Sequence, residues 1–314
     1  MVVTPQLYAG PAAASGGSTY SGCMGRVTAR VRATRLDPSA EIARLDRIET
    51  LAVEEPMQLR VEHGPEGARR REDIAVTMRT PGDDFDLALG HLLTEGLLTD
   101  PQTVAGMMHC TDVGPDGRPT FNVVDVVLRD GMSLADRPRH RPEVMTSACG
   151  VCGKDEIDAI TATTPYAVAA DPVRLAGSVL AGLPDEVRTQ QRGFDRTGGM
   201  HAAAIATAQG EVLAVREDVG RHNAADKVIG WAAREGMLPL TGHVLVVSAR
   251  ASFELVQKAV MAGLPALVAV SAPTSLAVDL AREQGLTLVA FARGARCTVY
   301  THPHRVLADA GPST

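Results

Sequence analysis

The chain has 314 residues, a length that allows one large domain or two of ordinary size. Its 31 basic and 37 acidic residues give a net charge of −6, which excludes a nucleic-acid-binding protein held by bulk positive charge. Aromatic residues are only 3% of the chain, too few for the stacking platforms that bind single strands. No apolar run approaches the roughly 20 residues that a membrane-spanning helix needs. Five cysteines, an odd and small number, predict free thiols in a reducing cytoplasm.

Residues 1–45 differ in composition from the rest of the chain. The segment from Gly10 to Gly22 is uncharged and lacks the basic start and apolar core of a secretory signal. We therefore predict a disordered tail over residues 1–45. Met24, which begins a more ordinary stretch, is a second candidate for the start of translation.

Residues 46–145 predict a small α+β subdomain. Segments rich in β-branched residues are separated by turn-forming residues. Leucines at helical spacing follow the sequence Pro-Gly-Asp-Asp. Residues 142–145 have a low propensity for β-structure, so no strand is expected there. The expected elements are strands over 48–62, 74–78 and 121–128 and a helix that follows Pro81–Asp84.

Residues 156–314 predict an α/β core. Short apolar runs alternate with amphipathic helices, a pattern typical of βαβ units around a buried, mostly parallel sheet. The expected elements are a hairpin over 201–217, a helix around 225–232, strands over 243–247, 266–270 and 286–291, and helices that begin near 253 and 276.

A C-x-x-C motif lies between these two parts, in a loop that we expect to be mobile over 146–155. Cys149 and Cys152 suit four interpretations: a redox dithiol, half of a zinc site, a sulfur carrier or idle thiols. Zinc is disfavoured because no second C-x-x-C exists, and no upstream histidine has the H-x-E spacing of the zinc deaminases. A helix expected to start at Lys154 would lower the pKa of a nearby thiol, which suits a nucleophilic sulfur.

Three strands of the predicted parallel sheet end in small polar or basic residues. Such segments meet at the carboxyl edge of a sheet, where ligands bind in open α/β folds. Ser252 and Ser275 are expected helix N-caps, and arginines add positive charge, so the edge predicts an anionic, nucleotide-like ligand. The alternative is that these residues are only caps and surface arginines. The segments are Ser248–Ser252, Ser271–Ser275 and Ala292–Arg296.

Two further polar strings, Arg196–His201 and Arg216–Asn223, flank the predicted hairpin. Asp218 could cap the following helix or hold His222 or Lys227. Such a cluster is either a buried hydrogen-bond network or the wall of an active site, and the sequence leaves both interpretations open.

Taken together, these strings resemble the formate dehydrogenase accessory sulfurtransferases, the FdhD family. The resemblance covers residues 48–305 in order and spacing. It rests on RTPGDDFDLALGHLLTEG from Arg79, CGVCG from Cys149, RTGGMHAAAIA from Arg196, REDVGRHNAADKVIG from Arg216, ASFELVQKAVMAG from Ala251 and SAPTSLAVDLAREQGLTLVAFARG from Ser271.

The resemblance implies a cytidine-deaminase-like, three-layer α/β/α core without a zinc site, and no structural metal. It implies a cytoplasmic sulfurtransferase that passes sulfur from a cysteine desulfurase to the molybdenum or tungsten bis-guanine-dinucleotide cofactor of formate dehydrogenase. Cys149 would carry a persulfide and Cys152 would assist. The family also suggests a homodimer. The residues expected to hold the cofactor's phosphates and guanine are Phe291, Ala292, Arg293, Gly294, Ala295, Arg296, Arg250, Ser252 and Ser271.

Two rival functions remain open at this point. One is a non-catalytic chaperone that binds and delivers the molybdenum cofactor while its cysteines are dispensable. The other is a dithiol oxidoreductase. The C-x-x-C motif favours chemistry over binding alone without excluding the chaperone.

Overall fold

A computed structural model describes residues 26–37, 39, 44–110, 121–135, 143–145 and 164–308. The C-x-x-C motif and the helix expected at Lys154 lie outside these residues. The helices are α1 (Asp84–Thr94), α3 (Gly177–Thr189), α4 (Arg192–Thr197), α5 (Arg221–Arg234), α6 (Phe253–Met261) and α7 (Ser275–Glu283). The strands are β1 (Thr28–Leu36), β2 (Arg44–Ala52), β3 (Glu55–His63), β4 (Arg70–Arg79), β5 (Val104–His109), β6 (Val123–Leu128), β7 (Glu143–Met145), β8 (Leu175–Ala176), β9 (His201–Thr207), β10 (Val212–Asp218), β11 (His243–Val247), β12 (Ala266–Ala269), β13 (Thr287–Arg293), β14 (Arg296–Val299) and β15 (Val306–Leu307).

A six-stranded mixed sheet forms the centre of the second half, in the order β10-β9-β11-β12-β13-β14. Strands β11, β12 and β13 are parallel, because α6 and α7 carry the chain back across the sheet between them. Their near-continuous apolar runs, such as Val244–Val247, are buried because both faces of the sheet are covered. The α/β class expected for this half is confirmed.

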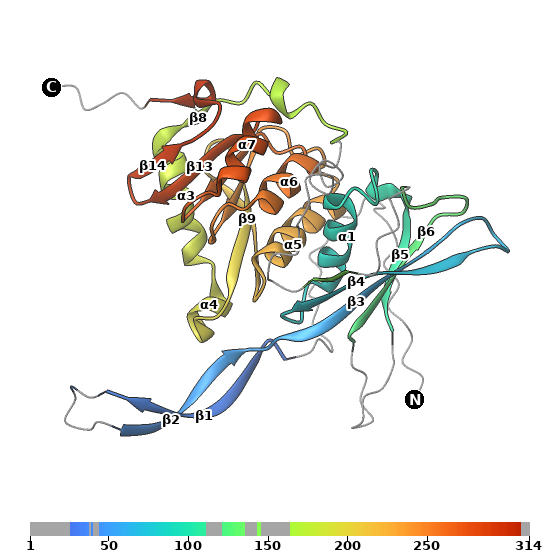
Figure 1. The fold of residues 1–314 in the computed structure, drawn as a ribbon, viewed down its shortest axis with the longest axis horizontal. Coiled ribbons are helices and arrows are strands. Elements are labelled where there is room, and N and C mark those ends of the chain that lie inside the picture. The colour runs from blue at the N-terminus through green and yellow to red at the C-terminus, as the bar shows by residue number, and fades with distance from the viewer. Residues whose placement is uncertain are drawn as a thin grey trace.

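The helices cover this sheet on both faces (Figure 1). Helices α5, α6 and α7 share one hydrophobic cluster with side chains such as Ile205, Leu245 and Leu288. Helix α3 covers the opposite face, where Leu180 and Leu183 pack against Val246 and Val268. Successive side chains of each strand point to opposite faces and so belong to two separate cores. The sheet therefore lies between helical layers. The specific likeness to cytidine deaminases stays a prediction.

A second, five-stranded sheet belongs to the first half, in the order β5-β6-β3-β4-β7. Leucines of α1, including Leu89 and Leu92, pack with Leu59 and Val126 of this sheet. The expectation that residues 142–145 form no strand is wrong. Strand β7 runs parallel to β4, where Met145 pairs with Thr77, so backbone pairing with a neighbour outweighs weak local propensity.

The first two strands form a hairpin arm that extends away from the rest of the molecule (Figure 1). The expectation of a disordered tail up to residue 45 is therefore wrong for 28–36, which pair with 44–52. In β1, Ala29, Val31 and Ala33 share one face and Arg30 and Arg32 the other, so the apolar face carries only small side chains and the segment resembles a polar tail in composition. Residues 1–25 of the predicted tail lie outside the described part.

Candidate functional site

The carboxyl ends of the parallel strands border a cavity of about 520 Å³. It lies at the edge that the sequence predicted for a ligand, and its size is within the usual range for small-molecule sites. Its walls are mostly apolar. The sheet contributes Val246, Val247, Ser248, Val270, Ala292 and Arg293, and the remaining wall comes from Pro184, Asp185, Val187, Arg188, Gln191, Phe194, Gly198, Gly199, Met200 and His201.

The structure brings only some of the predicted ligand-binding residues to this cavity. Ala292 and Arg293 line it, and Ser271 directly follows the lining residue Val270. Gly294 lies beside it, but its backbone N–H already donates to Asp185 Oδ2 at 3.0 Å, so this donor is occupied. Like Gly294 and Ser271, the other predicted residues do not line the cavity: Phe291, Ala295, Arg296, Arg250 and Ser252.

The wall opposite the sheet comes from α3, which was not predicted to belong to a site, and from α4, whose end overlaps the Arg196–His201 string. The guanidinium of Arg188 lies 4.7 Å from the centre of the Phe194 ring and pairs with Asp195 at 2.7 Å. The sequence holds no signal that joins α3 to the strand ends, because the contact arises from packing across the sheet. The nearby string Arg196–His201 was the one available hint.

Glu217, at the end of β10, holds this wall in place. Its two carboxylate oxygens accept hydrogen bonds from the backbone N–H groups of Gly193 and Phe194, at 2.7 and 2.8 Å. A carboxylate at the start of α4 satisfies amides that have no partner within the helix. One residue of the Arg216–Asn223 string thereby positions the Phe194 ring at the cavity.

His201 is the histidine that lines the cavity. Burial lowers the pKa of His201, and the neighbouring charges of Arg221 and His222 lower it further, against an opposing effect from Asp218. Its imidazole is therefore neutral at pH 7 and can act as a hydrogen-bond acceptor as well as a donor.

A second polar cluster follows along the same edge, at the start of α6. His222 Nε2 lies 2.8 Å from Glu254 Oε2, and Ser252 Oγ donates to the same oxygen at 3.2 Å. The hydrogen bond from His222 is the largest reason that the pKa of Glu254 falls to about 2. Ser252 occupies the N-cap position as predicted, but its side chain binds Glu254 and makes no capping hydrogen bond.

The predicted second cap is shifted by one residue. Thr274, and not Ser275, caps α7, because the Thr274 side chain accepts a hydrogen bond from the backbone N–H of Ala277. Both residue types cap helices well, so local sequence could not choose between the neighbours.

Asp218 resolves one alternative that the sequence left open. Its fully buried carboxylate pairs with Lys227 at 2.8 Å and accepts hydrogen bonds from Asn223 and from the backbone of Thr80. His222 instead pairs with Glu254. This part of the Arg216–Asn223 string is thus a buried hydrogen-bond network that ties the core to the first half of the chain.

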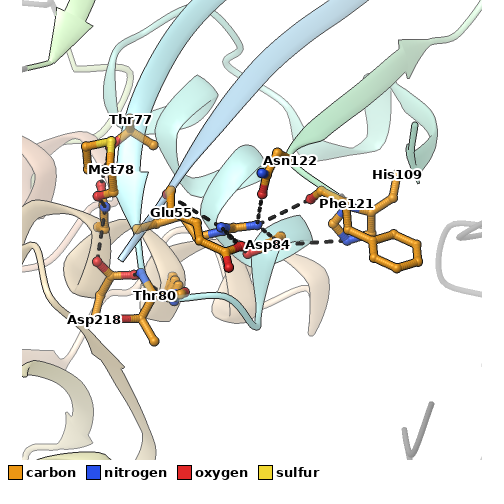
Figure 2. A network of polar contacts seen from close by, with 12 residues as sticks. Glu55, Thr77, Met78, Thr80, Asp84, His109, Phe121, Asn122 and Asp218 are labelled. Carbon is orange, nitrogen blue, oxygen red and sulfur yellow. Dashed lines mark hydrogen bonds and ion pairs between the residues drawn. The ribbon is translucent and has the colours of Figure 1, made fainter. Parts of the chain in front are cut away.

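Arg79 is the centre of a related network. Figure 2 labels several of its partners, among them Asp84, Phe121 and Asn122. Its buried guanidinium donates to both carboxylate oxygens of Asp84, at 3.0 and 3.1 Å, and to the carbonyl oxygen of Phe121. His109 lies 3.7 Å from Asp84, and burial is the main reason that the pKa of His109 is lowered. Because Asp84 is the first residue of α1, Arg79 fixes where that helix begins.

Cys149 and Cys152 lie outside the described residues, in the segment that follows β7. The last described residue before them, Met145, pairs with Thr77 of β4. Thr77 in turn donates a hydrogen bond to Asn223, next to the Asp218 network. Within the described ranges, no group of three or more His, Cys, Asp and Glu side chains could hold a metal ion. In the same residues, no helix is long and apolar enough to cross a membrane.

The fold and cavity define an α/β protein with a ligand-sized site at the carboxyl edge of its central sheet. Comparison with known proteins gives the family: residues 52–307 match the FdhD/NarQ family, and the chain belongs to it. A protein of Streptomyces avermitilis named sulfur carrier protein FdhD is 51% identical over 284 residues, which are 90% of this chain and 97% of that protein. A protein of Nocardia farcinica with the same name is 52% identical over 282 residues, 90% of this chain and 96% of its own length.

A solved structure supports the fold. The crystal structure of a candidate formate dehydrogenase accessory protein from Desulfotalea psychrophila matches with a TM-score of 0.64, over 90% of this chain and all of that one. The sequences are 20% identical, so this likeness concerns the fold alone.

Proposed function

We propose that this chain is a cytoplasmic sulfur carrier that takes sulfur from a cysteine desulfurase and delivers it to the molybdenum or tungsten bis-guanine-dinucleotide cofactor of formate dehydrogenase. The names of the relatives support the sulfur-carrying part, and the description of the structural neighbour supports the link to formate dehydrogenase. The cofactor is here a substrate that the protein binds and modifies.

The observation that carries the proposal is the cavity at the carboxyl edge. It is large enough for a nucleoside portion of the cofactor, and its apolar walls suit a flat base. Arg293 in its lining supplies a positive charge for a phosphate. The two halves of the chain meet beside this edge through Asp218, so a segment that starts at Met145 begins close to it.

The sulfur-loading step requires a thiolate. The Cys149 thiolate attacks the outer sulfur of the donor's persulfide, a new S–S bond forms on Cys149, and the donor's S–S bond breaks to leave its cysteine as a thiolate. Electrons balance because one persulfide is exchanged for another.

Delivery as sulfide needs two electrons, which Cys152 can supply. The Cys152 thiolate attacks Cys149 Sγ, the bond to the outer sulfur breaks, and this sulfur leaves as hydrosulfide after taking a proton. The two cysteines become a disulfide, so their oxidation balances the reduction of the outer sulfur. A cellular thiol reductant then restores the pair.

Formate dehydrogenase activity in cells tests the proposal. A strain that lacks its own copy of this protein is supplied with the wild-type chain, Cys149→Ala, Cys152→Ala or Cys297→Ala, the last as a control on β14. We expect activity with the wild type and the control, none with Cys149→Ala, and unchanged binding of GDP by purified Cys149→Ala. Full activity with Cys149→Ala would favour the cofactor chaperone instead.

A further inference from the structure

The cavity holds a carboxylate whose position bears on which base it accepts. Asp185 lies on α3, lines the cavity, and is held by the backbone N–H of Gly294 through one oxygen, Oδ2. Within the described residues it forms no ion pair, and the neighbouring Arg188 is engaged with Asp195 and Phe194. Asp185, which is exposed, therefore keeps a negative charge at the cavity, and the cation Arg293 lies in the same lining.

This charge bears on what can bind beside the Asp185 carboxylate. A phosphate would be repelled by Asp185, and the Gly294 N–H that could have bound it is already taken. An ionised carboxylate only accepts hydrogen bonds, so it attracts a group with donors. The space beside the Asp185 carboxylate thus suits a base, whereas Arg293 in the same lining suits a phosphate.

A buried amide lies in the same lining. Gln191 is 3% exposed and lines the cavity. An amide both donates and accepts hydrogen bonds, so it suits a ligand with polar edges. Phe194 and Met200 add apolar surface for the faces of a ring.

We propose that Asp185 reads the base of the nucleotide and selects guanine. Guanine presents two adjacent donors, N1–H and the 2-amino group, which match the two oxygens of one carboxylate. Hypoxanthine lacks the 2-amino donor, and adenine presents an acceptor at N1. The inference rests on the proposed function, since it assumes that the cavity takes the nucleotide part of the cofactor.

Calorimetric titration with GDP, IDP and ADP tests this assignment. The variants are Asp185→Asn, which changes charge but not size, and Glu186→Gln, the neighbouring acidic residue that does not line the cavity. One charge-assisted hydrogen bond corresponds to about 10–150-fold in affinity. We expect wild type and Glu186→Gln to prefer GDP to IDP by that factor and to bind ADP weakly.

In Asp185→Asn, we expect the affinity for GDP to fall to within about threefold of that for IDP. Equal binding of GDP and IDP by the wild type, or an unchanged GDP preference in Asp185→Asn, would overturn the role of Asp185 while leaving a nucleotide site in place. Failure of the wild type to bind any of the three nucleotides would overturn the nucleotide site of the proposed function together with this assignment.

Discussion

Asp86 on α1 and Gly230 on α5 touch where the two helices cross, and the carbonyl oxygen of Asp86 occupies the space that a Cβ on Gly230 would need. The same crossing places the carbonyl oxygen of Asp226 against Gly90. The side chain of Asp86 also binds Arg216 and Arg234. The two parts of the chain therefore meet backbone to backbone, which only glycine permits.

This crossing predicts a large effect of one methyl group. Gly230→Ala forces α1 and α5 apart, and we expect a loss of about 1–3 kcal/mol or more in the free energy of unfolding. Denaturant titration measures it. Gly182→Ala on α3 is the matched control, because no atom within 4 Å would meet its Cβ. Equal stability of Gly230→Ala and the control would contradict the close crossing.

The buried ion pair between Lys258 and Asp226 gives a second prediction. Its atoms lie 2.9 Å apart and both side chains are almost fully buried. Asp226→Asn leaves a buried ammonium without its main counter-charge, so we expect a loss of about 3–5 kcal/mol. Breaking the exposed Arg282–Asp279 pair on α7 with Arg282→Met should cost at most about 1 kcal/mol. Similar losses in both variants would contradict this account of the pair.

The link between His222 and Glu254 predicts a pH dependence. The pKa of Glu254 is about 2, below its ordinary 4.5, chiefly because His222 donates a hydrogen bond to it. A lowered pKa in the folded state means that the link stabilises the fold above pH 4.5, and that this contribution disappears as the pH falls from about 4.5 to about 2. The contribution is small because the Glu254 side chain is 57% exposed.

Carboxyl NMR titration of Glu254 measures this directly. In His222→Ala we expect the midpoint to rise from about 2 towards 4.5. A Glu254 midpoint that stays unchanged in His222→Ala would show that another group lowers the pKa.

Two arginines that look equivalent in sequence should differ in nucleotide binding. Arg293 lines the cavity, whereas Arg296 does not. We expect Arg293→Ala to weaken GDP binding by about 10–150-fold, the value of one charge-assisted contact. Arg296→Ala should change it much less. Equal losses in the two variants would contradict the assignment of the phosphate contact to Arg293.

The sequence predicted the central sheet well because its signals are local. Runs such as Val244–Val247 and Ala266–Ala269 are apolar at every position, which indicates strands buried on both faces. Strands β1 and β7 were missed because pairing partners, not their own residues, make them strands. A pattern within one segment cannot report a partner elsewhere in the chain.

The residues of the candidate site could likewise be predicted only where the signal is local in sequence. Arg293 and the cavity at the strand ends followed from a general rule on parallel sheets. Asp185 and Phe194 could not be predicted, because α3 and α4 reach the strand ends only through packing across the sheet. The role of the Arg216–Asn223 string was ambiguous because its residues do different things. Asp218 and Glu217 make structural contacts, whereas His222 pairs with Glu254 at the carboxyl edge of the sheet.

In the proposed function, Cys149 carries the sulfur. Intact mass spectrometry of the purified chain, after incubation with a cysteine desulfurase and free cysteine, tests it most directly. We predict that the wild type and Cys152→Ala gain the mass of one sulfur atom, which a thiol reductant removes, and that Cys149→Ala gains none. A sulfur atom bound equally well to Cys149→Ala would contradict the claim.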